Sequence, residues 1–412
     1  MACASYVRVC CASNLMSQSA DPLPAKTASK PKSAWNDPKV RGIFYQILVV
    51  VLVALGVWYL VSNTLQNLSV RNIATGFDFL AREAGFAIGE APISYTPEDT
   101  YSRALTVGLL NTLRAAVIGI VLATILGTII GIARLSSNWL VAKIASVYVE
   151  VMRNVPLLLQ LFFWYAIISE SFPGPRQALN PMPGVFLSNR GLKFPSLEGD
   201  GLTWLAAGFF FAIVAVLVLA NWSRRRQERT GQVFPIWRAS IALLLACPLL
   251  AWWLSGAELA LNMPELKGFN FRGGLTLTPE FAALLLGLVI YTAAFIAEVV
   301  RSGIQAVSHG QWEAAESLGL RRTMALRLIV LPQALRVIIP PMTSQYLNLT
   351  KNSSLAVAIG YPDIVSVVNT TLNQTGQAIE GIMIIMAAYL TVSLSISLFM
   401  NWYNARIALV ER

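Results

Sequence analysis

Eight stretches of this sequence are each long and apolar enough to cross a lipid bilayer as a helix, which takes about 20 predominantly apolar residues. Of all residues 56% are apolar and 13% are charged, whereas a soluble domain carries about 25% charged residues. No stretch alternates with a period of two, so a β-barrel is not indicated. The predicted fold is therefore an all-α, polytopic membrane protein with about eight transmembrane helices. The eight stretches are residues 43–62, 104–133, 144–168, 202–222, 236–254, 279–300, 335–356 and 379–402.

Basic residues are unevenly divided among the segments that connect these stretches. If the N-terminus is cytoplasmic, the cytoplasmic segments hold 20 of the 31 Lys and Arg residues, and the periplasmic segments hold 8. Because basic residues accumulate in cytoplasmic loops, both termini are predicted to be cytoplasmic. This distribution accounts for the net charge of +10 without a nucleic-acid partner. The segments assigned to the cytoplasm are residues 1–42, 134–143, 223–238, 301–336 and 403–412.

Residues 1–42 form a polar, basic cytoplasmic tail in this scheme and contain no apolar core of a secretory signal. Three of the four cysteines, Cys3, Cys10 and Cys11, precede Met16. We hypothesise that Met16 is the true start and that residues 1–15 are a misassigned extension.

The residues that catalytic and nucleotide-binding sites need are missing. His309 is the only histidine, so a His-based metal cluster or a paired-His relay cannot be built. No glycine is followed directly by lysine, which excludes the phosphate-binding Walker loop. We therefore predict that the chain is not an enzyme and that it holds no metal or cofactor of its own.

The most informative polar segment is the predicted cytoplasmic loop 302–334. Ala and Glu favour a short helix over residues 311–318, and Gly319 is placed to end it. A second polar stretch follows, and Pro332 predicts a further break before the membrane is re-entered. Such a helix and turn suit either a knob that docks on another protein or a plain amphipathic connector. The residues alone leave both interpretations open.

This loop resembles the EAA loop of permease subunits in bacterial ABC importers. Residues 313–332 match its pattern of Glu-Ala-Ala, three residues, Gly, nine residues and Ile-x-Leu-Pro. The resemblance implies a coupling helix that seats in a groove of a separate ATPase subunit, where ATP and Mg²⁺ are bound. It also implies that closure of the ATPase pair drives the transmembrane helices between outward- and inward-facing states. The candidate coupling residues are Glu313, Ala314, Ala315, Gly319, Arg321 and Arg322.

Residues 111–114, 127–136 and 150–160 resemble the polar-amino-acid permeases of the histidine/glutamine type, the run Arg-Asn-Val-Pro-Leu-Leu-Leu-Gln above all. The resemblance implies the five-helix core of a type I ABC importer permease. Its first part is predicted at residues 104–169 and its second part at 279–412. An extra first helix and its loop, 43–103, and a two-helix insertion with its loops, 170–278, are added. This layout resembles a permease subunit of the general L-amino-acid importers of Gram-negative bacteria.

The same resemblance implies a binding-protein-dependent importer of L-amino acids in the bacterial inner membrane. Its expected partners are a second, related but different permease chain, two ATPase subunits, a periplasmic amino-acid-binding protein and the lipid bilayer. Loops 63–103 and 170–201 are either the docking surface for the binding protein or plain solvated loops. The alternative function is an ion-coupled secondary transporter of small polar solutes, which should show inverted repeats and working intramembrane carboxylates.

Charged residues inside the apolar stretches are candidates for the substrate path, because a charge in the bilayer is costly and usually faces a cavity or a partner. Glu150 and Arg153 are three residues apart and are predicted to pair, as are Glu298 and Arg301. Arg114 has no such neighbour in the sequence.

Lys351 also lacks an acidic neighbour and lies in a polar cluster of the seventh stretch. Residues 344, 348, 351, 352 and 355 share one helix face. This face either lines the translocation path and meets a substrate carboxylate, or lets Lys351 reach the outer interface by snorkelling. The candidate path residues are Asn348, Lys351, Asn352, Ser353 and Arg114.

Small residues recur at four-residue steps in the second stretch. This pattern lets another helix approach closely, which is how membrane helices associate. Packing within the same chain is the simpler expectation, and packing against a partner permease is the alternative. The small residues are Ala115, Gly119, Ala123, Gly127 and Gly131.

Overall fold

The computed structural model describes residues 38–70, 76–232 and 234–407. The hypothesis about residues 1–15 falls outside these residues. The chain divides into two units, residues 1–73 and 74–412. The first unit contributes one long helix, α1 (Pro38–Val70), whose apolar side chains are exposed along its length. This helix is the predicted extra first span.

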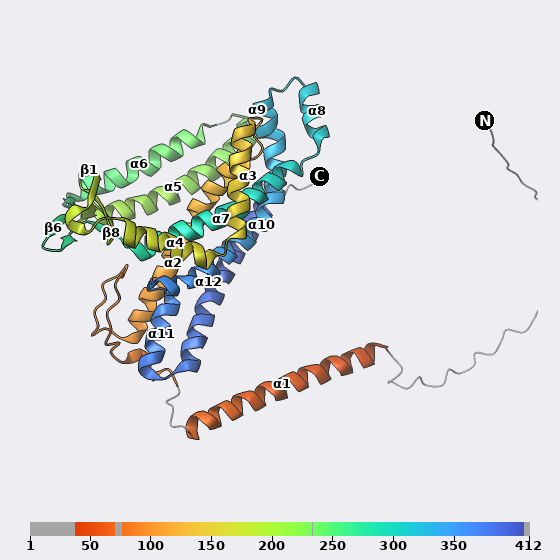
Figure 1. The fold of residues 1–412 in the computed structure, drawn as a ribbon. Coiled ribbons are helices and arrows are strands. Elements are labelled where there is room, and N and C mark those ends of the chain that lie inside the picture. Colours follow the sequence, from red (N-terminus) through yellow and green to blue (C-terminus); the bar gives the residue numbers. More distant parts are fainter. Residues whose placement is uncertain (1–37, 71–75, 233, 408–412) are drawn as a thin grey trace, which may run out of the picture. The chain divides into compact units, whose positions relative to one another are not determined.

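Long apolar helices make up most of the described residues (Figure 1). Seven of them are long and apolar enough to cross a membrane, and a bent helix pair makes eight. The prediction of an all-α membrane fold with about eight spans is confirmed. The helices of the second unit that meet this test alone are α2 (Tyr101–Ala133), α5 (Gly201–Thr230), α6 (Ile236–Ser255), α7 (Pro279–Gln305), the helical segment Thr323–Ile359 that contains α10 (Leu331–Asn352), and α12 (Ala378–Ile407).

The predicted third span, residues 144–168, is not one straight helix. It consists of α3 (Trp139–Asn154) and α4 (Leu157–Ala166), and the pair Trp139–Asn154 and Leu157–Ser171 is bent by 104°. Pro156 cannot donate a backbone hydrogen bond and keeps the preceding residue out of the helical region. Buried Gln160 stabilises the bend, because its Nε2 donates to the carbonyl oxygens of Met152 and Val155, both at 3.1 Å.

The small residues of α2 allow it to lie directly against α7. A Cβ atom added at Gly127 would be 2.6 Å from Ile296 Cγ2 and 2.8 Å from the Ala293 carbonyl oxygen. At Gly131 it would be 2.7 Å from the Ala297 carbonyl oxygen. The stripe therefore packs within this chain, as expected. Because dispersion contacts and close backbone approach replace hydrophobic burial inside lipid, this contact is a major source of helix association.

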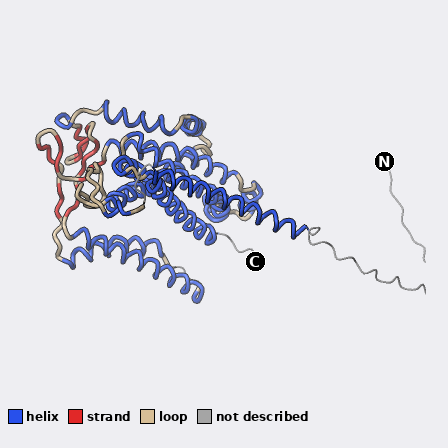
Figure 2. The backbone as a smooth tube through the Cα atoms, turned by 90° about the horizontal axis from the view of Figure 1, so that it is seen from below, coloured by secondary structure: helices blue, strands red, loops and turns tan. Residues whose placement is uncertain are grey.

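The two-helix insertion is closed at one end by short strands, in segments predicted to be loops. Strands of three or four residues are too short to show a period-two pattern, so the sequence does not indicate them. β1 to β3 and β8 form one antiparallel sheet, and β4–β5 and β6–β7 form two antiparallel pairs (Figure 2). The strands are β1 (Leu179–Met182), β2 (Val185–Ser188), β3 (Gly191–Phe194), β4 (Ser196–Glu198), β5 (Ala260–Asn262), β6 (Glu265–Lys267), β7 (Asn270–Arg272) and β8 (Leu275–Leu277).

The strand pairings set the direction of the helices that leave them. β3 pairs with β8, and β8 leads directly into α7. β4 leads into α5 and pairs with β5, which follows α6. The starts of α5 and α7 and the end of α6 therefore lie at one end, here called the sheet end, and Figure 1 shows α5 and α6 running side by side from it.

Replacing Gly127 with Ala should destabilise the fold by about 1–3 kcal/mol, because the added methyl group overlaps atoms of α7. The thermal unfolding of the purified protein in detergent measures this. Gly56→Ala in α1 is the matched control, since a Cβ added there meets nothing within 4 Å. An unchanged melting temperature for Gly127→Ala would contradict the close α2–α7 contact.

Candidate functional site

A short helix with a glycine turn forms in the predicted coupling loop. Helix α8 (His309–Ser317) ends in a motif in which Gly319 has a φ of +69°. The Gly319 N–H donates to the Glu316 carbonyl at 2.9 Å, and the Leu320 N–H donates to the Ala315 carbonyl at 3.1 Å. These are the two bonds of a Schellman cap, which explains why a glycine stands here.

The candidate coupling residues divide between the surface and the interior of this chain. Glu313 and Ala314 are exposed, whereas Ala315 is fully buried. Ala315 therefore helps to pack α8 on its own chain, in which α8 lies against α9 (Arg322–Ala325) and the helical turn after it. Arg321 is exposed and its carbonyl oxygen accepts the N–H groups of Met324 and Ala325. The side chain of Arg322 falls outside the described residues.

Leu318, at the tip of this loop, was not singled out in the sequence. Its side chain is 77% exposed, directly beside the left-handed Gly319. A large, exposed apolar side chain at the tip of a short helix can serve as an anchor in a pocket of a partner protein. Leu318 and Leu320 both flank Gly319, so the sequence does not distinguish them, and only the structure shows that Leu318 is the exposed one.

The break predicted at Pro332 does not occur. Helical structure continues from α9 through a wide turn, Leu326–Val330, into α10. This π-helical turn precedes Pro332, which stands in the first turn of α10, where a missing N–H is tolerated. The second half of the loop is therefore the start of the same helical segment, Thr323–Ile359, that is long enough to cross the membrane.

Glu298 of α7 forms ion pairs with two arginines near the stem of the coupling loop. It pairs with Arg134, which caps the C-terminus of α2, and with Arg301 one turn further along α7. Arg301 also donates to Gln305 Oε1 at 2.5 Å, at the last residue of α7. The predicted pairing of Glu298 with Arg301 is confirmed, and the added arm to α2 ties the stem of the loop to its neighbouring helix.

The predicted pairing of Glu150 with Arg153 is wrong. Among the described residues no ion pair involves either side chain, and the Arg153 guanidinium instead lies 5.1 Å from the centroid of the Phe295 ring. Arg153 lies in the last turn of α3, just before the bend at Pro156, where the Phe295 ring of α7 is its partner, and Glu150 lies one turn earlier.

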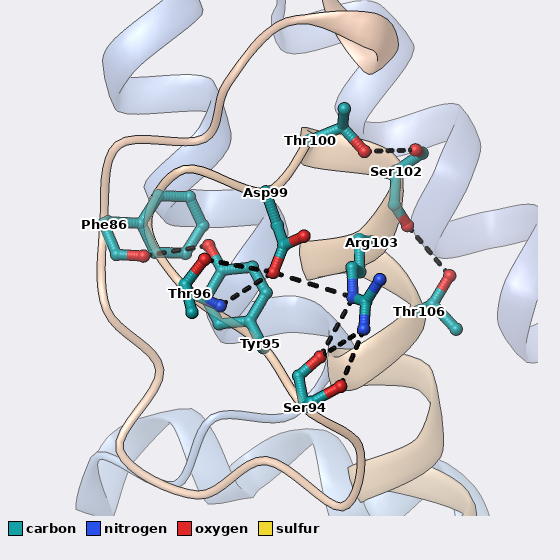
Figure 3. A network of polar contacts seen from close by, with 9 residues as sticks. All are labelled: Phe86, Ser94, Tyr95, Thr96, Asp99, Thr100, Ser102, Arg103 and Thr106. Atoms are coloured by element: carbon teal, nitrogen blue, oxygen red, sulfur yellow. Dashed lines mark hydrogen bonds and ion pairs between the residues drawn. The ribbon is translucent and has the colours of Figure 1, made fainter.

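At the other end of α2, residues 83–100 form an ordered loop rather than a plain connector. The Asp99 carboxylate accepts the Thr96 N–H at 2.8 Å, and Arg103 donates to the Ser94 carbonyl oxygen at 2.9 and 2.6 Å (Figure 3). Tyr95 closes the loop by donating to the Phe86 carbonyl oxygen at 2.8 Å. A loop held in this way presents one fixed surface at the sheet end.

Arg114 has a partner after all, and that partner comes from this loop. Its Nη1 lies 2.6 Å from Glu90 Oε1, and its guanidinium lies 4.3 Å from the centroid of the Phe281 ring. Glu90 also accepts a hydrogen bond from Thr278, the N-cap of α7, at 2.7 Å. The sequence could not reveal this pair because 24 residues separate the two charges.

The segment before α11 (Ile364–Thr375) is fastened to the same end of α2. Asn111 donates to the Pro362 carbonyl oxygen at 2.9 Å, and Thr112 accepts the Ile364 N–H at 3.1 Å. Asp363 caps α11 by accepting the Ser366 N–H at 2.8 Å, and burial raises its pKa to about 7. The residues 111–114 that carried a family resemblance are thus contact residues between helices and loops.

The candidate path residues do not all share one environment. Asn348 and Lys351 are exposed, Asn352 is half-buried, and Ser353 is fully buried with its hydroxyl donating to the Thr350 carbonyl oxygen at 2.7 Å. In the described part of the chain no carboxylate pairs with Lys351. The exposed face of α10 around Lys351 is therefore open to a partner chain, a solute or lipid.

Two comparisons with known proteins identify the family. Residues 229–409 match the family described as the binding-protein-dependent transport system inner membrane component. The putative amino-acid ABC transporter permease protein YhdX of Escherichia coli (strain K12) is 52% identical over 94% of this chain and 99% of its own length. This chain belongs to the amino-acid ABC transporter permeases.

Two further relatives of this permease agree in length and sequence. The general L-amino acid transport system permease protein AapQ of Rhizobium johnstonii is 52% identical over 92% of this chain and 96% of its own. The glutamate/glutamine/aspartate/asparagine transport system permease protein BztB of Rhodobacter capsulatus is 43% identical over 91% of this chain and 96% of its own. The resemblance drawn from the sequence motifs is confirmed, and a secondary transporter is not favoured.

Replacing Glu298 of the permease with Gln should lower its stability by about 2 kcal/mol, because two charge-assisted contacts are lost, one to Arg134 at the end of α2 and one to Arg301 within α7. Thermal unfolding in detergent measures this. Glu265→Gln is the matched control, since the ion pair of Glu265 with Lys267 at 3.4 Å is exposed to solvent and such pairs contribute little to stability. Equal melting temperatures for the two variants would show that Glu298 does not hold the helices together.

Proposed function

We propose that this permease is the transmembrane subunit of an ATP-driven importer that carries L-amino acids across the bacterial inner membrane by alternating access. It works with a second, related permease chain, two ATPase subunits and a periplasmic amino-acid-binding protein. The observation that carries the proposal is the exposed α8 knob, which has the complete EAA spacing and is joined by the turn at Gly319 to a helical segment long and apolar enough to cross the membrane. The relatives that are named amino-acid permeases supply the substrate class.

The coupling site is formed by the exposed face of α8 and its turn. Glu313 and Ala314 meet a groove of the ATPase subunit, Leu318 fills a pocket there, and Arg321 adds a charged contact. Ala315 and Gly319 act indirectly by holding the knob in shape, since one is buried and the other closes the Schellman cap. ATP and Mg²⁺ bind in the ATPase subunit, which supplies the hydrolysis that this chain does not perform.

The coupling loop lies on the cytoplasmic side, and the sheet end faces the periplasm. Helix α7 runs from β8 to the stem of the coupling loop, so these two features stand on opposite sides of the membrane. The excess of basic residues in the segments at the coupling side supports this orientation. Both termini are then cytoplasmic.

The binding protein docks on the sheet end. The loop of residues 83–100 and the strands of the insertion give a surface held by hydrogen bonds, on which polar groups stand beside exposed apolar side chains such as Phe269, and a rigid soluble partner can dock on such a surface. The ion pair of Glu90 with Arg114 connects this surface to α2. Docking of the binding protein on this surface can therefore displace α2 through the ion pair of Glu90 with Arg114.

The exposed side chains of Asn348 and Lys351, with Asn352 beside them, face the translocation path, and Lys351 binds the substrate carboxylate. Arg114 contributes a positive electrostatic potential to the path, which the paired carboxylate of Glu90 reduces. The buried Ser353 shapes the end of α10 and does not reach the solute.

The double variant Glu313→Arg, Gly319→Val should lose the ATPase subunit, since it reverses a surface charge and places a β-branched residue at a φ of +69°. A pull-down from native membranes in mild detergent measures retention, and amino-acid uptake should fall about tenfold or more. The second permease should stay bound to both forms.

Glu265→Arg is the control for retention of the ATPase subunit in the pull-down, because it reverses an exposed charge at the sheet end, away from α8. If the wild type comes alone, or if the double variant keeps the ATPase, α8 is not the coupling site.

Lys351→Met should reduce amino-acid uptake in cells by about tenfold or more, because a charge-assisted hydrogen bond to the substrate carboxylate is lost. Lys143→Met, which removes an exposed positive charge from α3, is the control. Full uptake by Lys351→Met would reject the substrate contact and support snorkelling of Lys351 to the interface.

A further inference from the structure

Five arginines gather at the end of the inserted helix hairpin that lies away from the sheet end. Four belong to the last turns of α5 and one to the first turn of α6, and Glu228 is the only acidic residue among them. In the described residues none of the five is paired with a carboxylate. The arginines of this group, here called the hairpin arginines, are Arg224, Arg225, Arg226, Arg229 and Arg238.

The length of α5 places its arginines beyond the apolar part of the bilayer. Thirty residues of helix span about 45 Å, and the hydrocarbon core is about 30 Å thick. The helix starts at the sheet end, so the surplus length falls at its C-terminal, arginine-bearing turns. The side chains of Arg224, Arg225 and Arg229 are exposed there.

Aromatic side chains lie at the base of the arginines. The Arg226 guanidinium lies 5.2 Å from the centroid of the Trp222 ring, and the Arg238 guanidinium lies 5.1 Å from that of Trp237. Trp222 also meets Phe234 edge to face at 5.6 Å. Tryptophans collect at the level of the lipid headgroups. The arginines directly above them therefore stand at the height of the lipid phosphates.

The hairpin packs on itself and exposes the rest of its surface to lipid. Helices α5 and α6 approach closely at Gly208, where an added Cβ would lie 2.8 Å from the Cys247 carbonyl oxygen and from Ala251 Cβ. Helix α6 has no buried residue, and most of the α5 side chains are exposed. Bilayer lipid is the solvent for such a surface, so lipid molecules are present within reach of every hairpin arginine.

We propose that the hairpin arginines form a binding site for the phosphate groups of anionic phospholipids in the cytoplasmic leaflet. Guanidinium groups bind phosphate oxygens through two parallel hydrogen bonds, and an arginine that is not already paired keeps this capacity free. Two helix ends side by side provide more cations than one phosphate needs, which suits a lipid with two phosphates or two neighbouring lipids. The site does not depend on the proposed transport function.

The test is lipid binding by the full-length protein in neutral nanodiscs, titrated with cardiolipin, phosphatidylglycerol or phosphatidylcholine of the same acyl chain. The wild type should bind the two anionic lipids in preference to phosphatidylcholine. The triple variant Arg224→Gln, Arg225→Gln, Arg229→Gln should bind them about 100-fold more weakly, since each basic residue near the surface contributes about fivefold. The triple variant Arg176→Gln, Lys267→Gln, Arg272→Gln removes as many charges at the sheet end and should match the wild type.

A charge-conserving triple variant, Arg224→Lys, Arg225→Lys, Arg229→Lys, separates charge from folding. It should keep most of the preference for anionic lipid, because Lys also attracts phosphate but as a point charge. The proposal is overturned if the wild type shows no preference, or if the Gln variant binds like the wild type. It is also overturned if inorganic phosphate alone displaces the lipid at equal concentration, or if the Gln variant loses the ATPase subunit while lipid binding is unchanged.

Discussion

The contact between α2 and α7 is the constraint on which the rest of the second unit depends. Glycines at positions 127 and 131 let the two backbones approach until carbonyl oxygens and side chains of α7 occupy the space of a missing Cβ. In lipid, no gain of hydrophobic burial holds helices together, so close packing and polar contacts must do so. Helix α7 then serves as the common partner of α2, α3, α4 and α10.

Polar groups fasten this helix pair at both ends. At the sheet end, Glu90 joins Arg114 of α2 to Thr278 at the start of α7. At the coupling end, Glu298 joins Arg134 of α2 to the last turns of α7. The two helices are therefore held to each other at both ends. In the proposed alternating-access cycle, the contacts expected to change are others, such as those of α10 with α12.

Sequence patterns predicted the parts of this fold that depend on local chemistry. Span positions, the α8 helix, the turn at Gly319 and the pairing of Glu298 with Arg301 all follow from neighbours in the sequence, and the structure confirms them. The partner of Arg114 lies in a loop 24 residues away, so no helical spacing could indicate it. The strands are only three or four residues long and show no period-two pattern. The bend at Pro156 depends on the hydrogen bonds from Gln160 to the carbonyl oxygens of Met152 and Val155, which the sequence does not reveal.

The shape of the coupling knob explains why its sequence combines small, charged and apolar residues. A nine-residue helix is too short to be stable by itself in water, so α8 must be held by tertiary contacts and by its cap. Buried Ala315 and the Schellman turn at Gly319 supply these on one side of the helix. The opposite side is then free to carry Glu313 and Leu318 for a partner. In the proposed mechanism, a force on those two residues passes through the turn at Gly319 to α9, the π-helical turn and α10, which form one continuous helical path with no break at Pro332.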